Sequence, residues 1–367
     1  MDPASEFVRA FEVDRHDFRT TRVVTASLRE LAPGQVRLGI ERFALTTNNI
    51  TYAVAGDMLD YWGFFPAEAP WGRLPAMGLA TVAESAHPDI AVGGRYFGFY
   101  PMSTDVVIQA APRGTGFWDV GDHRANHAAS YTHFSDVAHD PTFQPDRADE
   151  YLLLRGLFTT SFLADDYLAD NGFLCAEQTL VTSASSKTSI CLAACLAQRA
   201  DQRSIGLTSP RNRPFVEGLG LYDEVLSYDE IDRLDPAVPS ALVDMAGSAP
   251  VRAAVHTHFA EQLTISLTIG ATHWEDTGGS ARLPGPKPEF FFAPGQVAKR
   301  TAEWGADELN ARIGRSFHRF LDDTERWLTV EHRTGPDAIE DVYRTLLEGD
   351  AAPNVGYVVS MREGLLS

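Results

Sequence analysis

Short runs in which hydrophobic and polar residues alternate dominate the chain between Val23 and Tyr100. Two such runs occupy residues 36–45 and 80–85, and a third, at residues 95–101, follows a Gly-Gly pair. A period of two, interrupted by proline and glycine, is typical of half-buried strands. The first third of the chain is therefore predicted to form a β-rich, barrel-like unit.

The pattern changes near Tyr151, beyond which hydrophobic residues recur at helical spacing over residues 152–171. Strand patterns then alternate with helical ones, and the main predicted strands lie at residues 178–184, 203–209, 241–247 and 263–272. This alternation predicts a doubly wound parallel sheet, an α/β fold. Residues 354–364 have strand character again, so the β-rich domain is predicted to be discontinuous.

Residues 112–150 are polar, rich in histidine and aspartate, and dotted with aromatic residues. They are predicted to be a long insertion or lid. Their histidines match no common metal-ligand spacing, which favours a solvated surface over a metal site. The predicted domains are a β-rich domain over residues 8–155 and 324–367, which includes this insertion, and a nucleotide-binding domain over residues 156–323.

The charge balance narrows the classes of partner. The chain has 31 Lys and Arg against 50 Asp and Glu, a net charge of −19, which opposes nucleic acid and anionic membranes. No apolar run is long enough to span a membrane. Three cysteines, without zinc-ligand spacing or a signal peptide, predict a reducing, cytoplasmic location. Any anionic ligand must therefore be held by a local cluster of cations.

A strand, turn and helix at residues 181–197 form the sharpest motif. Dinucleotide folds place glycines in this turn so that a pyrophosphate can approach the helix N-terminus. Here Ser183, Ser185 and Ser186 occupy the turn, and Lys187 and Thr188 follow in the first helical turn. A cation there is unfavourable unless an anion binds, which predicts a phosphate site. The alternative is a serine N-cap with a solvated lysine. A P-loop is rejected because its glycines are absent.

The end of the second strand indicates which dinucleotide would bind. NAD sites place an acidic residue there, whereas NADP sites place arginine and small hydroxyls beside the 2′-phosphate. The chain has Ser209, Arg211 and Arg213 after this strand and no acidic residue. This favours NADP (NADPH), and the alternative is a solvated basic loop.

On these motifs, much of the chain resembles the medium-chain dehydrogenase/reductase superfamily, specifically its zinc-free quinone-oxidoreductase-like and enoyl-reductase-like branch. The segments that carry the resemblance are residues 33–56, 92–101, 181–197, 205–228, 241–248 and 354–360. Residues 154–168 and 270–274 further resemble a functionally uncharacterised subfamily. The resemblance implies a GroES-like domain interrupted by a Rossmann domain, a substrate cleft between them, and a homodimer.

The resemblance also implies roles for particular residues. Zinc-dependent members have a cysteine within the segment that reads TTNN here, and Gly-His-Glu at the position of Met77, so no metal is expected. In the zinc-free branch, residues matching Asn48, Tyr52 and Tyr61 line the substrate site, where a donor can stabilise charge developing on oxygen. The alternative is that these side chains satisfy buried backbone groups.

Gly270 and His273 follow the strand whose carboxyl end should face the cofactor, which makes them further candidates, with an ordinary loop as the alternative. The predicted function is NADPH-dependent, zinc-independent reduction of an activated C=C bond (enone or quinone) or of a carbonyl. Two alternatives remain open. One is a redox-neutral lyase or isomerase that retains NADP, and the other is a non-catalytic NADPH-binding protein.

Overall fold

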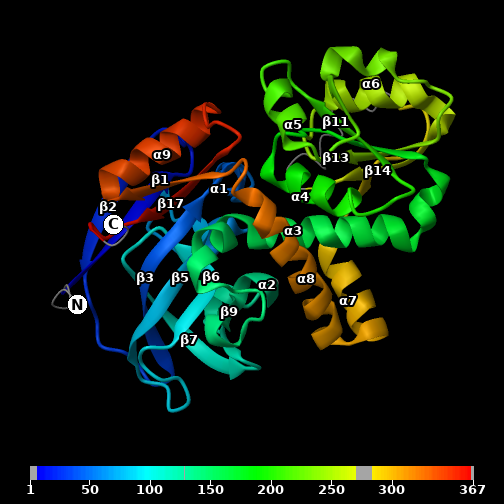
Figure 1. Ribbon diagram of the computed structural model, residues 1–367. Coiled ribbons are helices and arrows are strands. Elements are labelled where there is room, and N and C mark those ends of the chain that lie inside the picture. The colour runs from blue at the N-terminus through cyan, green and yellow to red at the C-terminus, as the bar shows by residue number, and fades with distance from the viewer. Residues whose placement is uncertain (1–5, 128, 270–282, 365–367) are drawn as a thin grey trace. The chain divides into compact units, whose positions relative to one another are not determined.

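The computed structural model describes residues 6–127, 129–269 and 283–364. The chain divides into two compact units, Met1–Leu153 with Thr329–Ser367, and Leu154–Leu328 (Figure 1). We refer to them as the barrel unit and the sheet unit. The sheet unit is inserted in sequence into the barrel unit, so the two segments of the barrel unit lie at opposite ends of the chain.

The strands of the barrel unit form a barrel and a small separate sheet. β3 (Gln35–Leu45) pairs with three different strands, β5, β7 and β17. The order β16-β17-β3-β5-β6-β9-β8-β7, with the extra β3–β7 pairing, closes the barrel, and β2-β1-β4 forms the small sheet. The bounds of the other strands are β1 (Phe7–Asp14), β2 (Thr21–Ser27), β4 (Trp71–Gly72), β5 (Pro75–Ser85), β6 (Arg95–Pro101), β7 (Asp105–Arg113), β8 (Gly116–Asp119), β9 (His133–Asp136), β16 (Thr329–Thr334) and β17 (Val355–Ser360).

The alternation seen in the sequence selects the residues of the barrel core. Along β3, Val36, Leu38 and Ile40 are buried while the residues between them are only partly covered. Each such side chain stabilises the fold by about 1.5–3 kcal/mol when it is removed from water. The helices of this unit are α1 (Thr47–Val54), α2 (Ala129–Thr132) and α9 (Pro336–Glu348). The predicted β-rich domain is thereby confirmed.

Residues 112–150 are not the lid that their polar composition predicts, because they supply β8 and β9 to the barrel. Phe117 and Phe134 are buried and stacked with ring centroids 5.4 Å apart. Phe134 lies close to two glycines. A Cβ atom at Gly98 would stand 2.5 Å from the Phe134 ring, and a Cβ atom at Gly116 would stand 2.0 Å from the Phe134 carbonyl oxygen. Part of the segment therefore belongs to the barrel, through two strands that are only four residues long.

The sheet unit contains a parallel sheet of six strands in the order β12-β11-β10-β13-β14-β15. This is the Rossmann order 3-2-1-4-5-6, in which the chain reverses direction across the sheet between β10 and β13. The strands are β10 (Gln178–Val181), β11 (Arg203–Thr208), β12 (Glu224–Ser227), β13 (Ser240–Asp244), β14 (Leu263–Thr268) and β15 (Glu289–Phe290). The predicted doubly wound sheet is confirmed.

Helices cover both faces of this sheet (Figure 1). Neighbouring residues of one strand point to opposite faces, so Val181 packs with one hydrophobic cluster, which includes α3 and α4, and Leu180 with another, which includes α6. Burial of both faces explains why these strands are continuous hydrophobic runs. The helices are α3 (Ala148–Asp170), α4 (Lys187–Leu196), α5 (Arg213–Leu219), α6 (Ala249–Phe259), α7 (Ala293–Trp304) and α8 (Ala306–Thr324).

Candidate functional site

The turn between β10 and α4 is held by its own serines. Ser186 caps α4, because its hydroxyl oxygen accepts a hydrogen bond from the Ser189 backbone N–H at 3.2 Å. The Ser189 hydroxyl donates in turn to the Thr182 carbonyl at 3.0 Å. Ser183 has a φ of +49°, a left-handed conformation that usually favours glycine, and its N–H donates to the Tyr228 hydroxyl at 3.1 Å. Hydroxyl groups therefore stabilise a tight turn that other dinucleotide folds build with glycine.

Asp244, at the end of β13, joins this turn to the neighbouring strand. Its fully buried carboxylate accepts hydrogen bonds from the Thr182 hydroxyl at 2.7 Å and from the Gly247 N–H at 3.1 Å, and it pairs with Arg252 at 3.2 Å. These bonds fix the end of β10 to the end of β13. The two strands lie on either side of the point where the chain reverses direction across the sheet. In such sheets, ligands bind beyond the carboxyl ends of the strands at this point.

The loop after β11 lies against the same turn. Asn212 donates its side-chain N–H to the Ser185 hydroxyl at 3.0 Å, which holds the loop beside the start of α4. Arg213 is occupied by two carboxylates, Glu217 at 2.7 Å and Glu230 at 2.5 Å. Arg211, in contrast, is exposed and forms no ion pair within the residues that the structure describes. Of the two predicted arginines, Arg211 is thus the one whose guanidinium can receive a ligand.

Lys187 is the first residue of α4, and burial lowers the pKa of its amine to about 8. Two effects disfavour its charged form: removal from water, and the partial positive charge at the N-terminus of a helix. An anion bound at the turn would oppose both. Lys187 therefore has the electrostatic character of a phosphate-binding residue, and it stands next to Thr188 at the serine turn. Gly270 and His273 lie outside the described residues.

In the barrel unit, the rings of Tyr52 of α1 and Tyr61 pack against each other at a tilt of 33°, with centroids 4.6 Å apart. The Asn48 side chain hydrogen-bonds Tyr52 one helical turn further on. Burial is the main cause that raises the pKa of both phenols well above its ordinary value. Both phenols are consequently protonated at neutral pH and can donate hydrogen bonds. The structure brings these three predicted residues together.

Asn49, which follows Asn48 in the sequence, has a structural role. Its carbonyl oxygen accepts a hydrogen bond from the Thr46 N–H at 2.8 Å, and its amide donates to the Pro75 carbonyl at 2.9 Å. The side chain is buried and links α1 to β5. Asn49 thus satisfies backbone groups, which was the alternative role stated for Asn48, whereas the Asn48 side chain hydrogen-bonds Tyr52.

Tyr131 lies beside the pair formed by Tyr52 and Tyr61. It belongs to residues 112–150, in which the sequence analysis named no catalytic candidate. Its hydroxyl lies 3.4 Å from that of Tyr61, and its ring packs 5.1 Å from Phe99 between ring centroids. His127 lies beside the same group, 4.4 Å from the Phe64 ring, and its Nε2 is 3.1 Å from an Asp60 carboxylate oxygen. A cluster of aromatic and hydroxyl groups results. The one feature of the sequence that could have indicated this cluster was the density of aromatic residues between positions 112 and 150.

Three further features bear on metal ions, cysteines and membranes. Within residues 6–127, 129–269 and 283–364, no group of three His, Cys, Asp or Glu side chains is placed to hold a metal ion. Cys191 and Cys195 are buried on α4. In the same part of the chain, no helix is both long and apolar enough to cross a bilayer.

Comparison with known proteins places these features in a family. A family model described as "Protein of unknown function (DUF2855)" matches residues 43–352. Comparison with curated protein sequences gives no significant match.

Solved structures with a similar fold include CurA from Vibrio vulnificus in complex with NADPH, with a TM-score of 0.59, 12% identity and 97% and 99% of the two chains covered. Another is the yhdH oxidoreductase from Salmonella enterica in complex with NADP, with a TM-score of 0.54, 16% identity and 96% and 100% coverage. A third is a putative NADPH:quinone reductase from Bacillus thuringiensis, with a TM-score of 0.55, 13% identity and 97% and 99% coverage. The chain therefore belongs to the DUF2855 family, and it has the fold of these reductases, a GroES-like domain interrupted in sequence by a Rossmann domain.

Proposed function

We propose that this protein is an NADPH-dependent oxidoreductase that reduces an activated C=C bond, as in an enone or quinone, or a carbonyl, without zinc. The observation that carries the proposal is the cationic turn at the carboxyl edge of the parallel sheet. There Lys187 is half-buried in the first turn of α4, and Arg211 stands in the adjoining loop without an ion pair in the described part of the chain. Similar folds in complexes with NADPH and NADP support the choice of cofactor.

The residues at this edge fit a dinucleotide that carries a 2′-phosphate. The pyrophosphate would be held by Lys187, by the hydroxyls of the serine turn, and by N–H groups of the first helical turn, including that of Thr188. Arg211 and Ser209 would hold the 2′-phosphate, because an arginine fork matches the geometry of a phosphate group. Arg213 is assigned a supporting role, since Glu217 and Glu230 already neutralise it.

NADPH, when bound, supplies a hydride. Addition of hydride to an activated double bond or a carbonyl leaves negative charge on the substrate oxygen, which a hydrogen-bond donor stabilises. We assign this donor to Tyr52, whose phenol is kept protonated by burial. Asn48 would orient the Tyr52 hydroxyl, and Tyr61 with Tyr131 would form the aromatic wall of the substrate site. His273 stays a prediction.

The first test is NADPH binding to the intact protein. NADPH should quench tryptophan fluorescence and raise the melting temperature, whereas NADH should do so only at much higher concentration. Absence of any effect at millimolar NADPH would rule out the proposal. The second test is NADPH oxidation with a benzoquinone, a cyclic enone and an aldehyde, because these cover the three proposed substrate classes.

Tyr52→Phe tests the assignment of the donor. Removal of a hydrogen-bond donor to a developing oxyanion typically lowers kcat by about 100-fold or more, so kcat should fall by about that factor while KM and NADPH binding change little. Tyr96→Phe is the matched control, because Tyr96 is also a half-buried tyrosine of the barrel unit but packs against Phe117, away from the cluster. Substrate conversion without net NADPH consumption would replace the proposal with a redox-neutral reaction. Binding without any turnover would favour a non-catalytic protein.

A further inference from the structure

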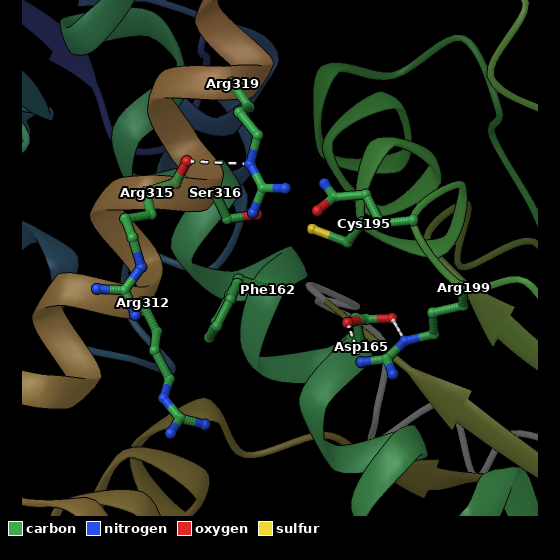
Figure 2. A pocket seen from close by; sticks show the side chains of 9 residues that line it. Phe162, Asp165, Cys195, Arg199, Arg312, Arg315, Ser316 and Arg319 are labelled. Carbon is green, nitrogen blue, oxygen red and sulfur yellow. Dashed lines mark hydrogen bonds and ion pairs between the residues drawn. The ribbon is translucent and has the colours of Figure 1, made fainter.

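A second cationic site lies in the sheet unit, at the carboxyl end of α4. An open pocket of about 290 Å³ lies there, lined by residues of α3, α4 and α8 (Figure 2). Four of its nine lining residues are arginines: Arg199, Arg312, Arg315 and Arg319. In a chain with a net charge of −19, such a concentration of positive charge in one small pocket calls for a physical reason.

The sequence places three of these arginines on one side of α8. Positions 312, 315 and 319 are spaced by three and four residues, so their side chains lie on one face of the helix. Other residues of α8, among them Ile313 and Phe317, are buried in the core. Figure 2 shows Arg319 extending from α8 toward Cys195 of α4. The arginine face of α8 and the end of α4 thus form two sides of the pocket.

The carboxylates near the pocket do not balance its positive charge. Asp165 binds Arg199 through two hydrogen bonds of 2.6 Å, which explains Arg199 as a structural residue. Glu308 is shared between Arg312 at 2.8 Å and Arg315 at 3.3 Å. Arg319 has no carboxylate partner among the described residues, and its Nε donates only a long hydrogen bond, 3.4 Å, to the Arg315 carbonyl. Four guanidinium groups thus face two carboxylates, which leaves two positive charges in excess, one of them on Arg319.

We propose that this pocket binds a compact small molecule with at least two anionic groups, either phosphates or carboxylates. Arginine is suited to both, because its planar fork can donate two parallel hydrogen bonds to either group. Phe162 and the buried Cys195 provide an apolar wall against which the body of such a ligand can pack. The volume is sufficient for a molecule of about the size of citrate or pyrophosphate and too small to contain a whole dinucleotide.

The pocket is separate from the proposed NADPH site. The serine turn is at the amino end of α4 and the pocket is at its carboxyl end, and a 10-residue helix is about 15 Å long. The inference therefore does not depend on the proposed function. A ligand bound here would contact α3, α4 and α8, whose hydrophobic residues meet in one cluster with β10 and β13.

The test measures binding of citrate and of inorganic pyrophosphate to the full chain by calorimetry and by the shift in melting temperature. The wild-type protein should bind at least one of them, and a preference between the two identifies the anionic group. Arg319→Gln should weaken binding at least about tenfold, because it removes a charge-assisted hydrogen-bond donor. Arg326→Gln is the control, since Arg326 is 82% exposed, pairs with Asp323, and does not line the pocket.

Two further variants separate this pocket from the NADPH site. Citrate binding should survive Lys187→Met, and NADPH binding should survive Arg319→Gln. The proposal is overturned if neither anion binds at 10 mM, or if Arg319→Gln and Arg326→Gln weaken binding equally. It is also overturned if anion binding is lost in Lys187→Met and kept in Arg319→Gln. Failure of NADPH to bind the wild-type protein would contradict the proposed function and leave this test intact.

Discussion

The two ends of α4 carry positive charge in opposite ways. At the amino end, one half-buried lysine stands beside a turn whose hydroxyls are hydrogen-bonded to one another and to the backbone, and burial lowers the pKa of its amine to about 8. At the carboxyl end, four arginines line an open pocket, and three of them are exposed. The protonation of the lysine at the amino end therefore depends on pH near neutrality, whereas the arginines at the carboxyl end stay protonated.

The difference shows how burial changes what a cation can do for an anion. A buried charge interacts strongly because little water screens it, but its protonation is costly. An exposed guanidinium remains charged at every accessible pH, but water and salt weaken its attraction. The amino end should therefore bind tightly and respond to pH, whereas the carboxyl end should bind more weakly and respond to salt.

The largest effect is expected from Lys187→Met. A charge-assisted hydrogen bond to phosphate contributes about 1.5–3 kcal/mol, so NADPH affinity should fall by roughly 10- to 100-fold in fluorescence titrations. Lys299→Met is the control, since Lys299 is exposed and pairs with Asp170. Unchanged NADPH affinity in Lys187→Met would contradict the assignment.

A somewhat smaller effect is expected at the 2′-phosphate. Arg211→Gln should weaken NADPH binding by about tenfold and leave NADH binding unchanged, because only NADPH carries the group that Arg211 is proposed to hold. Arg213→Gln should alter the NADPH-to-NADH ratio less, since two carboxylates already engage Arg213. If Arg211→Gln weakened NADPH binding and NADH binding equally, the assignment of Arg211 to the 2′-phosphate would be wrong.

The pH dependence sharpens the contrast between the two ends. Since the pKa of Lys187 is about 8, most molecules hold its proton at pH 7 and few at pH 9, so NADPH affinity should fall up to about tenfold across this range. Lys187→Met should abolish this fall, and citrate binding at the arginine pocket should remain constant. A pH dependence that persists in Lys187→Met would assign the titrating group elsewhere.

The same pKa has an opposite consequence for stability without ligand. The unfolded chain keeps the ordinary lysine pKa of 10.5 and the folded chain has the lower value, so between pH 8 and 10.5 the unfolded state binds more protons. The contribution of Lys187 to the free energy of unfolding should therefore rise with pH over this window. Comparison of wild type with Lys187→Met in urea at pH 8 and pH 10 isolates the contribution.

The smallest effect is expected from salt. An increase of NaCl from 0.05 to 0.5 M shortens the screening length several-fold, and citrate binding to the exposed arginines should weaken by about threefold to tenfold. The contribution of Lys187 to NADPH binding, measured as the ratio of the affinities of wild type and Lys187→Met, should respond less, because Lys187 is half-buried whereas these arginines are exposed. Calorimetric titrations at both salt concentrations provide the comparison, and an equal response at the two sites would contradict the distinction drawn between them.

Residue patterns predicted the architecture well where periodicity was long and regular. The parallel sheet followed from hydrophobic runs such as that of β10, which alternate with helical segments. The short strands β8 and β9 were missed, because each contains only four residues and gains its stability from Phe134 packed over distant glycines. Such contacts between residues far apart in sequence leave no local period.

The candidate site was predicted unevenly for a similar reason. The serine turn and Lys187 stand in one continuous motif, so their proximity followed from chain order. The different environments of Arg211 and Arg213 did not, because they depend on Glu230, a residue of the segment that follows β12. Tyr131 likewise joined Tyr61 only through the folding of a segment 70 residues away.

By itself, the sequence determined the fold class, the discontinuous order of the domains, and the small hydroxyl residues and lysine at the start of α4, since these depend on local spacing and chain order. Only the tertiary structure decided which cations remain free of carboxylates, which tyrosines touch, and that three arginines of α8 meet a fourth at the end of α4. Charge pairing and burial are properties of neighbours in space. They decide whether a cation is a structural residue or one that can bind a ligand.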